Sequence, residues 1–398
     1  MQTSSSNAFR PEFRPKNAES CDFNPGSGSV QKTLDNILFY VQIEMSISEN
    51  KSHTSTQVER LNISFLDDAI VKARKYRDTT LHSTTTIRSS APNSQIQDSI
   101  QRGDVIEFYG PASGGKTTIL YHIALTTILP PSWNRIYGEN LDSHDIIDVN
   151  ATIELSGRGK GVIFFDLDGK FDIQRLYSMM IYHLHKQVEI TLKEDINLIP
   201  SESEIGSIAK NALKRIHVFK PNLSESFYAT LLDLPKYMRE LQQNENYEFS
   251  FLMIDQINVF YWEDKDYDEV GIIANDTWKN NNIHYYIKAL KQIIELTGVT
   301  VITTNWAITP PEAIDRIPLN LCYPVVAHAA WQSFVKYRFV VDRQSVPQYD
   351  VCPEEAHNLK VNFLSRSLFY GRLTTPNNNP SDVDVFQFGI DEGGIVFK

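Results

Sequence analysis

One segment has the residue types and spacing needed to hold a phosphate chain. It matches the pattern G-x-x-x-x-G-K-[ST], in which glycines let backbone amides wrap closely around an anion. Lys116 would reach the β- and γ-phosphates, and Thr117 would offer its hydroxyl to Mg²⁺. The helix expected to follow would add the positive end of its dipole. The pattern therefore predicts a nucleotide site whose binding residues are Gly110, Ser113, Gly114, Gly115, Lys116, Thr117 and Thr118.

Two acidic positions are candidates for the rest of this site. Asp255 ends the apolar run 251–254, as expected of a carboxylate that orients Mg²⁺ from a neighbouring strand. Asp168 follows the apolar run 161–166 and could position a water for attack on the γ-phosphate. Lys116 and Asp168 are therefore the candidate catalytic residues, and Thr117 and Asp255 the candidate metal ligands. Asp172, a little further on, is more typical of a cap on the next helix.

The elements around these residues predict an α/β fold. Short apolar runs predict strands over residues 105–109, 161–166, 216–219, 249–254 and 299–304. Helix-length segments alternate with them, the clearest being 116–129, 223–243 and 284–297. This alternation indicates parallel crossovers and a mostly parallel sheet with helices on both faces. From about Tyr337 to Lys398 short strands are expected to dominate.

The first hundred residues differ from the rest of the chain in amino-acid composition and in the secondary structure that they predict. Residues 1–32 are rich in Ser, Asn, Pro and Gly, which predicts a disordered tail. Residues 33–100 predict a helical segment and linker, with one helix near 34–45 and a second from about Gln57 to Arg77. The second ends in the basic run 72–77, typical of cations near a helix C-terminus, or alternatively of a contact with DNA or a partner protein. The core domain is expected over residues 101–398.

Composition narrows the class of protein. With 398 residues, 41% hydrophobic and 22% charged, the chain is long and apolar enough for a substantial core. No apolar run approaches the ~18 residues of a membrane span, and no secretory signal is visible. The three cysteines, without CxxC spacing, predict neither a disulfide framework nor structural zinc, and favour a reducing intracellular compartment. A net charge of −11 means that any nucleic-acid contact would be local.

Between residues 103 and 398 the motifs resemble, in order, the RecA family of recombination ATPases, and in particular the eukaryotic strand-exchange recombinase and its paralogues. The phosphate-binding loop is shared by many families and is not specific. More specific segments are Gly103 to Phe108, Tyr121-His122, Phe171-Asp172, Arg175-Leu176, Phe260-Tyr261-Trp262, Ala330-Trp331-Gln332, Val335-Lys336, Arg338 and Gly389 to Phe397.

The resemblance implies a RecA-like ATPase core that binds ATP and Mg²⁺. It implies a nuclear protein of homologous recombination, in double-strand break repair and meiosis. The protein would act with other recombinase paralogues to help the main recombinase load on, or persist at, single-stranded DNA. Lys116 and Thr117 would take the phosphate and metal roles, Asp255 the second metal role, and Arg175 would lie against the adenine ring.

Three departures from the family pattern modify these expectations. Asp168 stands where active recombinases have Glu, and a positioning error of ~1 Å can cost ~10²-fold in rate, so at most a weak DNA-dependent ATPase is expected. Asn305-Trp306 replaces the family's Asn-Gln, which relays the γ-phosphate state to the DNA-binding loops. No Phe-x-x-Ala motif occurs in the linker, which favours a defined hetero-complex over self-polymerisation.

DNA contacts are expected to be weak in the isolated chain. The two loops that meet DNA in the family correspond here to 263–279, which is acidic, and 310–323, which has few cations. Better basic candidates, or ordinary surface charges, are the segment 157–160 and Lys336, Arg338 and Arg343. The aromatic segment 260–262 and Trp331 could stack on bases, although core or interface packing is more typical of such residues.

Three functions are compatible with these patterns. The first is an ATP-binding recombination mediator that works in a complex. The second is a pure scaffold in which the phosphate-binding loop is a relic, because fold alone does not determine function. The third is a small-molecule kinase, which the lack of an evident acceptor-site or lid signature disfavours.

Overall fold

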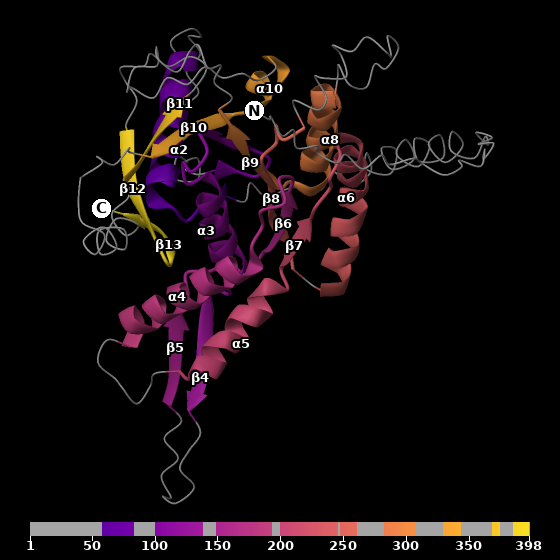
Figure 1. Ribbon diagram of the computed structural model, residues 1–398. Coiled ribbons are helices and arrows are strands. Elements are labelled where there is room, and N and C mark those ends of the chain that lie inside the picture. Colours follow the sequence, from indigo (N-terminus) through magenta and orange to yellow (C-terminus); the bar gives the residue numbers. More distant parts are fainter. Residues whose placement is uncertain are drawn as a thin grey trace, which may run out of the picture. The chain divides into compact units, whose positions relative to one another are not determined.

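Figure 1 shows the computed structural model, which describes residues 58–82, 100–137, 149–192, 200–245, 247–260, 282–307, 329–343, 368–374 and 385–397. These residues belong to one compact unit, Thr56–Lys398. The expected disordered tail over 1–32 and the expected helix near 34–45 lie outside the described residues. No helix within the described ranges is long and apolar enough to cross a membrane.

A nine-stranded sheet forms the centre of this unit, in the order β13-β12-β11-β10-β3-β9-β8-β6-β7. The six strands from β10 to β7 are mutually parallel, and the other three are antiparallel. The parallel strands are β10 (Tyr337–Arg343), β3 (Val105–Gly110), β9 (Thr300–Trp306), β8 (Phe249–Asp255), β6 (Gly161–Asp166) and β7 (Ile216–Phe219). The antiparallel strands are β11 (Leu368–Thr374), β12 (Val385–Asp391) and β13 (Gly394–Phe397). The predicted α/β class, with short strands at the C-terminal end, is confirmed.

Helices cover both faces of the sheet (Figure 1). One face packs against α3 (Lys116–Ile128), α4 (Ile173–Leu192) and α5 (Glu202–Leu213). The other packs against α6 (Ser224–Glu245), α8 (Asn282–Thr297) and α10 (Ala329–Phe334). Successive residues of β6 alternate between the two clusters, since Phe164 faces the first and Phe165 the second. Burial on both faces explains why these strands read as continuous apolar runs.

The N-terminal described segment packs on the first of these faces. β1 (Val58–Glu59) pairs with β2 (Ile100–Gln101), and α2 runs over Ser64–His82, so the helix begins later than the expected Gln57. Leu66 and Ile70 of α2 are fully buried in the core. Arg74, from the basic run, donates to Asp104 at 3.0 Å and to the Tyr337 hydroxyl at 3.1 Å. Arg74 therefore helps to hold α2 against the sheet. The expected domain boundary at residue 101 stays a prediction.

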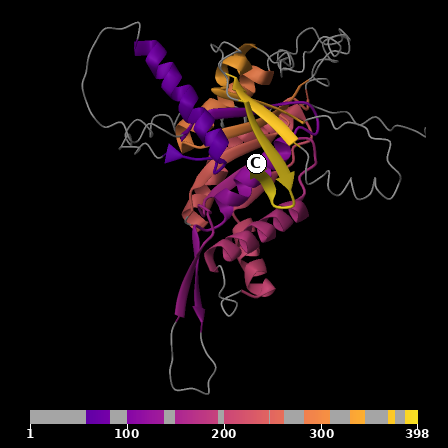
Figure 2. The same ribbon diagram turned by 90° about the vertical axis from the view of Figure 1, so that its left-hand side faces the viewer.

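A two-stranded ribbon between α3 and β6 was not predicted. β4 (Ser132–Tyr137) pairs antiparallel with β5 (Val149–Glu154), and α4 packs beside β5. Figures 1 and 2 show the ribbon running away from the central sheet. Its root is anchored by the buried Ile153 and by Trp133, which packs against the core. β5 alternates apolar and polar residues at every position, which is the signal of a half-buried strand, whereas β4 lacks a regular alternation.

Candidate nucleotide-binding site

The candidate site residues gather at the carboxyl edge of the parallel strands. Gly110 at the end of β3 is level with Trp306 at the end of β9. Asp255 at the end of β8 is level with Asp166 at the end of β6. Because these strands are parallel, segments that are far apart in sequence leave the sheet side by side. The predicted phosphate-binding loop lies there, between β3 and α3.

Two glycines of the loop are required for different reasons. A Cβ on Gly110 would lie 1.9 Å from the Val341 carbonyl oxygen, so the strand end can pack against β10 only as glycine. Gly115 has φ +84°, the left-handed region that glycine adopts without strain. A Cβ on Gly115 would lie 3.0 Å from Ile390 Cδ1 and 3.4 Å from Phe369 Cδ1, two side chains of the C-terminal strands. The loop is therefore held from two sides before it meets any ligand.

Lys116 is buried in the loop that would bind the phosphate chain. Its ammonium group donates to the carbonyl oxygens of Gly110 at 2.9 Å and Pro111 at 2.7 Å. Burial lowers the pKa of Lys116 to about 8, against the opposing charges of Asp255, Asp342 and Asp168. A desolvated cation with only carbonyl partners is a strong attractor for an anion.

Thr117 and Asp255, the two candidate metal ligands, are in direct contact. The Thr117 hydroxyl donates to Asp255 Oδ2 at 2.9 Å, and the Thr304 hydroxyl donates to Asp255 Oδ1 at 2.5 Å. Burial raises the pKa of Asp255, while these two hydrogen bonds act in the opposite direction. The hydroxyl and carboxylate oxygens are the kind of hard ligands that Mg²⁺ prefers.

Asp168 lies at the same edge of the sheet, where it forms an ion pair with Lys170. Its Oδ2 lies 2.8 Å from the ammonium nitrogen of Lys170, while its Oδ1 is buried without a hydrogen-bond partner. Asp166 shapes the same turn: it accepts the backbone N–H of Lys170 at 2.9 Å and of Phe171 at 3.0 Å. Asp166 also pairs with Lys220 at 2.8 Å. Of these two acids, Asp166 is the structural one.

Arg175 lies beside the loop helix α3. Its guanidinium donates to the Thr118 hydroxyl at 2.8 Å and lies over the Tyr121 ring at 5.9 Å. Asp172 accepts the backbone N–H groups of Gln174 at 2.9 Å and Arg175 at 3.2 Å, which confirms it as the predicted cap of α4. The side chain of Thr118 thus positions Arg175, a role that sequence reasoning did not foresee.

A buried carboxylate under the loop was missed by sequence reasoning. Glu107 of β3 is fully buried and accepts from Asn305 Nδ2 at 2.8 Å and Trp331 Nε1 at 2.7 Å. Arg338 Nε completes the set with a short hydrogen bond to Glu107. The signal was a charged residue inside the apolar run 105–109, where an acid is stable only if it is paired.

A second internal network lies next to it. Asp104 accepts from Lys336 at 2.5 Å, from Arg74 at 3.0 Å and from the backbone N–H of Gln101 at 3.0 Å. Two segments that carry the family resemblance, 103–108 and 330–338, are therefore joined by buried ion pairs. Core packing is the correct interpretation of Trp331 and of the buried Phe260.

The basic candidates for DNA binding are largely used inside the protein. Arg158 donates to the Thr127 hydroxyl at 3.2 Å and lies 4.9 Å over the Phe251 ring. Lys160 pairs with Glu248 at 4.0 Å. Arg158, Lys336 and Arg338 are thus engaged by groups of the protein itself, although the Lys336 side chain stays 31% exposed, and a contact of these cations with DNA stays a prediction. The loops 263–279 and 310–323 lie outside the described residues.

Trp306 is presented to solvent next to the phosphate-binding loop. Its side chain is 45% exposed, whereas Asn305 before it is buried. Asn258 fixes its backbone from both sides, donating to the Trp306 carbonyl at 3.0 Å and accepting its N–H at 3.2 Å. The residue that replaces the family's Gln therefore presents an aromatic ring in a defined position.

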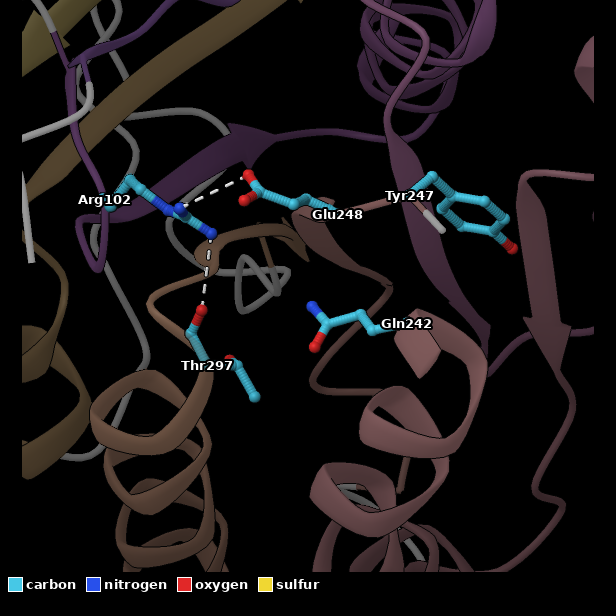
Figure 3. A pocket seen from close by; sticks show the side chains of 5 residues that line it. All are labelled: Arg102, Gln242, Tyr247, Glu248 and Thr297. Carbon is cyan, nitrogen blue, oxygen red and sulfur yellow. Dashed lines mark hydrogen bonds and ion pairs between the residues drawn. The ribbon is translucent and has the colours of Figure 1, made fainter. Parts of the chain in front are cut away.

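A cavity of about 390 Å³ lies at the opposite, amino edge of the sheet (Figure 3). Arg102 projects into it and donates to the carbonyl oxygens of Gly298 at 3.2 Å and Thr297 at 3.4 Å. The same guanidinium pairs with Glu248 at 3.7 Å. These contacts tie the end of α8 to the starts of β3 and β8, so the cavity is separate from the phosphate-binding loop.

Comparison with known proteins agrees with the motif pattern, although no family model matches the chain. Over 230 residues the chain is 25% identical to the DNA repair protein XRCC2 homolog of Arabidopsis thaliana, covering 52% of this chain and 56% of that relative. Over 285 residues it is 22% identical to the DNA repair protein XRCC2 of Mus musculus, covering 69% of this chain and 85% of that relative. The match thus spans little more than half of the Arabidopsis relative. The chain is homologous to XRCC2, a paralogue within the RecA family.

Proposed function

We propose that this chain is an ATP-binding recombinase paralogue of the nucleus that acts in double-strand break repair by homologous recombination. It would assist the main recombinase on single-stranded DNA as part of a paralogue complex. The similarity to proteins named for DNA repair supports the process. The observation that carries the nucleotide site is the contact between Thr117 and Asp255 beside the buried Lys116.

The residues present fit a nucleoside triphosphate with Mg²⁺. Thr117 and Asp255 offer adjacent oxygens for the metal, at 2.9 Å from one another. When bound, Mg²⁺ would neutralise phosphate charge and orient the phosphates. Lys116 would bind the β- and γ-phosphates, and the exposed Arg175, which lies beside α3, would cover the adenine. The Oδ1 of Asp168 is buried without a hydrogen-bond partner, so the side chain would have to turn before this oxygen could accept a proton from a bound water.

Binding, rather than rapid turnover, is the proposed use of ATP. Asp168 has a shorter side chain than the Glu of active recombinases, and its second oxygen is paired with Lys170. Both features oppose the activation of a water, so we expect at most a weak ATPase. The conformation held by bound ATP would then be what partner proteins recognise.

Partners are proposed to supply most of the DNA binding. Arg158, Lys336 and Arg338 are engaged by internal partners, and the chain as a whole is acidic. Filter binding of single-stranded DNA to the isolated chain should therefore be weak. Tight binding that falls steeply with salt would contradict this part of the proposal.

Survival of cells after induced double-strand breaks tests the proposed function. Cells deleted for the gene are complemented with wild type, Lys116→Ala, or Lys210→Gln, a matched control that removes an exposed lysine of α5. We expect sensitivity in the deletion and rescue by wild type and Lys210→Gln but not by Lys116→Ala. A deletion without sensitivity would contradict the repair role.

A nucleotide-independent scaffold is the second candidate. Two observations favour it: Asp168 is paired with Lys170, and Trp306 occupies the position of the family's Gln. A scaffold requires that Lys116→Ala rescue survival as well as wild type does. Direct measurement of ATP binding to both proteins would separate the two candidates without relying on cells.

A further inference from the structure

Lys170 is a cation at the edge of the candidate site with no assigned role so far. It lies in the turn between β6 and α4, where Asp166 fixes its backbone N–H at 2.9 Å. Its ammonium nitrogen is 2.8 Å from Asp168 Oδ2, and its side chain is 77% exposed. A fixed backbone thus carries an exposed charge on a flexible side chain.

The charges around Lys170 connect it to the phosphate-binding loop. Its positive charge acts to lower the pKa of Lys116, while Asp168, Asp255 and Asp166 raise its own pKa. Lys170 therefore lies close enough to Lys116 and to the acids at the ends of β6 and β8 to interact with them electrostatically.

The acids of this edge would repel a polyphosphate unless they were compensated. Asp166 is paired with Lys220 at 2.8 Å, and Asp255 receives hydrogen bonds from Thr117 and Thr304. Asp168 is compensated by Lys170. Because the partner of Asp168 is exposed, this pair contributes little to stability and can be exchanged readily.

We propose that Lys170 is a second phosphate-contacting cation, whose ammonium group exchanges Asp168 for the terminal phosphate of a bound nucleoside triphosphate. This inference rests on the proposed function, because it requires ATP at the phosphate-binding loop. Lys116 offers a parallel, since its ammonium group is paired with the carbonyl oxygens of Gly110 and Pro111, which are weaker acceptors than a phosphate.

Two consequences follow from this exchange. The γ-phosphate, which is the terminal phosphate of ATP, is absent from ADP, so Lys170 would make the chain distinguish the two nucleotides. Asp168 would lose its counter-ion on binding, which frees its Oδ2. In the ATP-bound state the shorter side chain of Asp168 would then be the feature that limits turnover.

Equilibrium binding of nucleotides to the full chain tests the proposal. A non-hydrolysable ATP analogue and ADP, each with Mg²⁺, would be titrated by calorimetry into wild type, Lys170→Gln, Lys170→Arg and the control Lys210→Gln. We expect Lys170→Gln to weaken the ATP analogue about tenfold and ADP by less than about twofold, since one charge-assisted hydrogen bond is lost. Lys170→Arg and Lys210→Gln should bind both nucleotides as wild type does.

The outcomes separate this inference from the proposed function. If Lys170→Gln leaves both affinities unchanged, or lowers both equally, the inference fails while the nucleotide site stands. If wild type binds neither nucleotide, both fail. Matched thermal unfolding of the variants would show that the substitutions act on binding rather than on folding.

A double-mutant cycle with Asp168→Asn tests the exchange itself. Removing the competing carboxylate should strengthen binding of the ATP analogue more in wild type than in Lys170→Gln, because only wild type has a lysine to release. Equal effects in the two backgrounds would show that Asp168 and Lys170 act independently, and would overturn the exchange.

Discussion

Two groups of carboxylates lie on different strands of the central sheet, with β9 between β3 and β8, and their surroundings differ. Glu107 and Asp104, on β3 and just before it, receive hydrogen bonds from side chains of the surrounding elements. Asp255 is the last residue of β8, and Asp168 lies just beyond the end of β6 and keeps a buried oxygen without a partner. Buried polar groups are normally satisfied, so incomplete satisfaction at a strand end points to a group that meets a ligand.

The comparison also shows how the two regions are connected. Asn305 donates to Glu107, and the next residue, Trp306, is exposed beside the phosphate-binding loop. One strand, β9, therefore joins the open site to the Glu107 network, in which the carboxylate is satisfied although Asn305 Oδ1 is buried without a hydrogen-bond partner. A change in the network is expected to reduce stability, whereas a change in the open site is expected to reduce ligand affinity.

The largest expected effect is the loss of the Glu107 network. Glu107→Gln leaves the buried guanidinium of Arg338 without its counter-ion, which typically costs about 3–5 kcal/mol in the free energy of unfolding. Urea unfolding followed by circular dichroism would measure it. Adding Arg338→Met should recover part of the loss, because no unpaired charge then remains buried. A Glu107→Gln protein as stable as wild type would remove the distinction between the two regions.

Lys116→Ala is expected to have the opposite profile. We expect at least ~100-fold weaker ATP binding, because a desolvated charge-assisted contact is lost. The free energy of unfolding should change little, since burial disfavours the Lys116 cation and lowers its pKa to about 8. Calorimetric titration and urea unfolding of the same samples would check both. A large loss of stability would place Lys116 with the structural network.

Asp255→Asn separates metal binding from folding. The amide oxygen can still accept from one of the two threonine hydroxyls, and the amide NH2 can donate to the other hydroxyl once that hydroxyl turns to accept. Burial also raises the pKa of the Asp255 carboxyl, so we expect less than about 1 kcal/mol loss of stability. The Mg²⁺ dependence of ATP binding should shift to about tenfold higher Mg²⁺, because a charged ligand is lost. An unchanged Mg²⁺ dependence would exclude Asp255 as the metal ligand.

The smallest expected effect is the pH dependence of stability that comes from the buried, hydrogen-bonded His122. Its Nδ1 accepts the backbone N–H of Ile395 at 3.4 Å, and burial lowers its pKa to about 4. The unfolded chain, with a pKa near ~6.5, takes up the proton first, so stability should fall as the pH drops from ~6.5 toward 4. Between pH 7 and 5.5 we expect a loss of about 1 kcal/mol that His122→Gln removes. An equal pH slope in the variant would assign the loss to other histidines.

Local patterns were sufficient to predict most of the fold around the site. The apolar runs of β3, β6, β7, β8 and β9 and the helices α3, α6 and α8 lie where periodicity placed them, because strands buried on both faces leave a clear apolar signal. The ribbon β4–β5 lacks the continuous apolar runs by which the central strands were identified, and the alternation of apolar and polar residues in β5 was the signal that could have found it. The helix α2 begins at Ser64 rather than near Gln57, since Val58 and Glu59 pair with β2.

For the candidate site, spacing determined the phosphate-binding loop but not the partners of its residues. The sequence by itself determined the position of Lys116 and Thr117 between a strand and a helix, because that motif is local. Only the tertiary structure decided that Thr117 meets Asp255, that Lys170 pairs with Asp168, and that Arg338 pairs with Glu107. Such pairings depend on strand order and register, which bring together residues from distant parts of the chain and which no local pattern encodes.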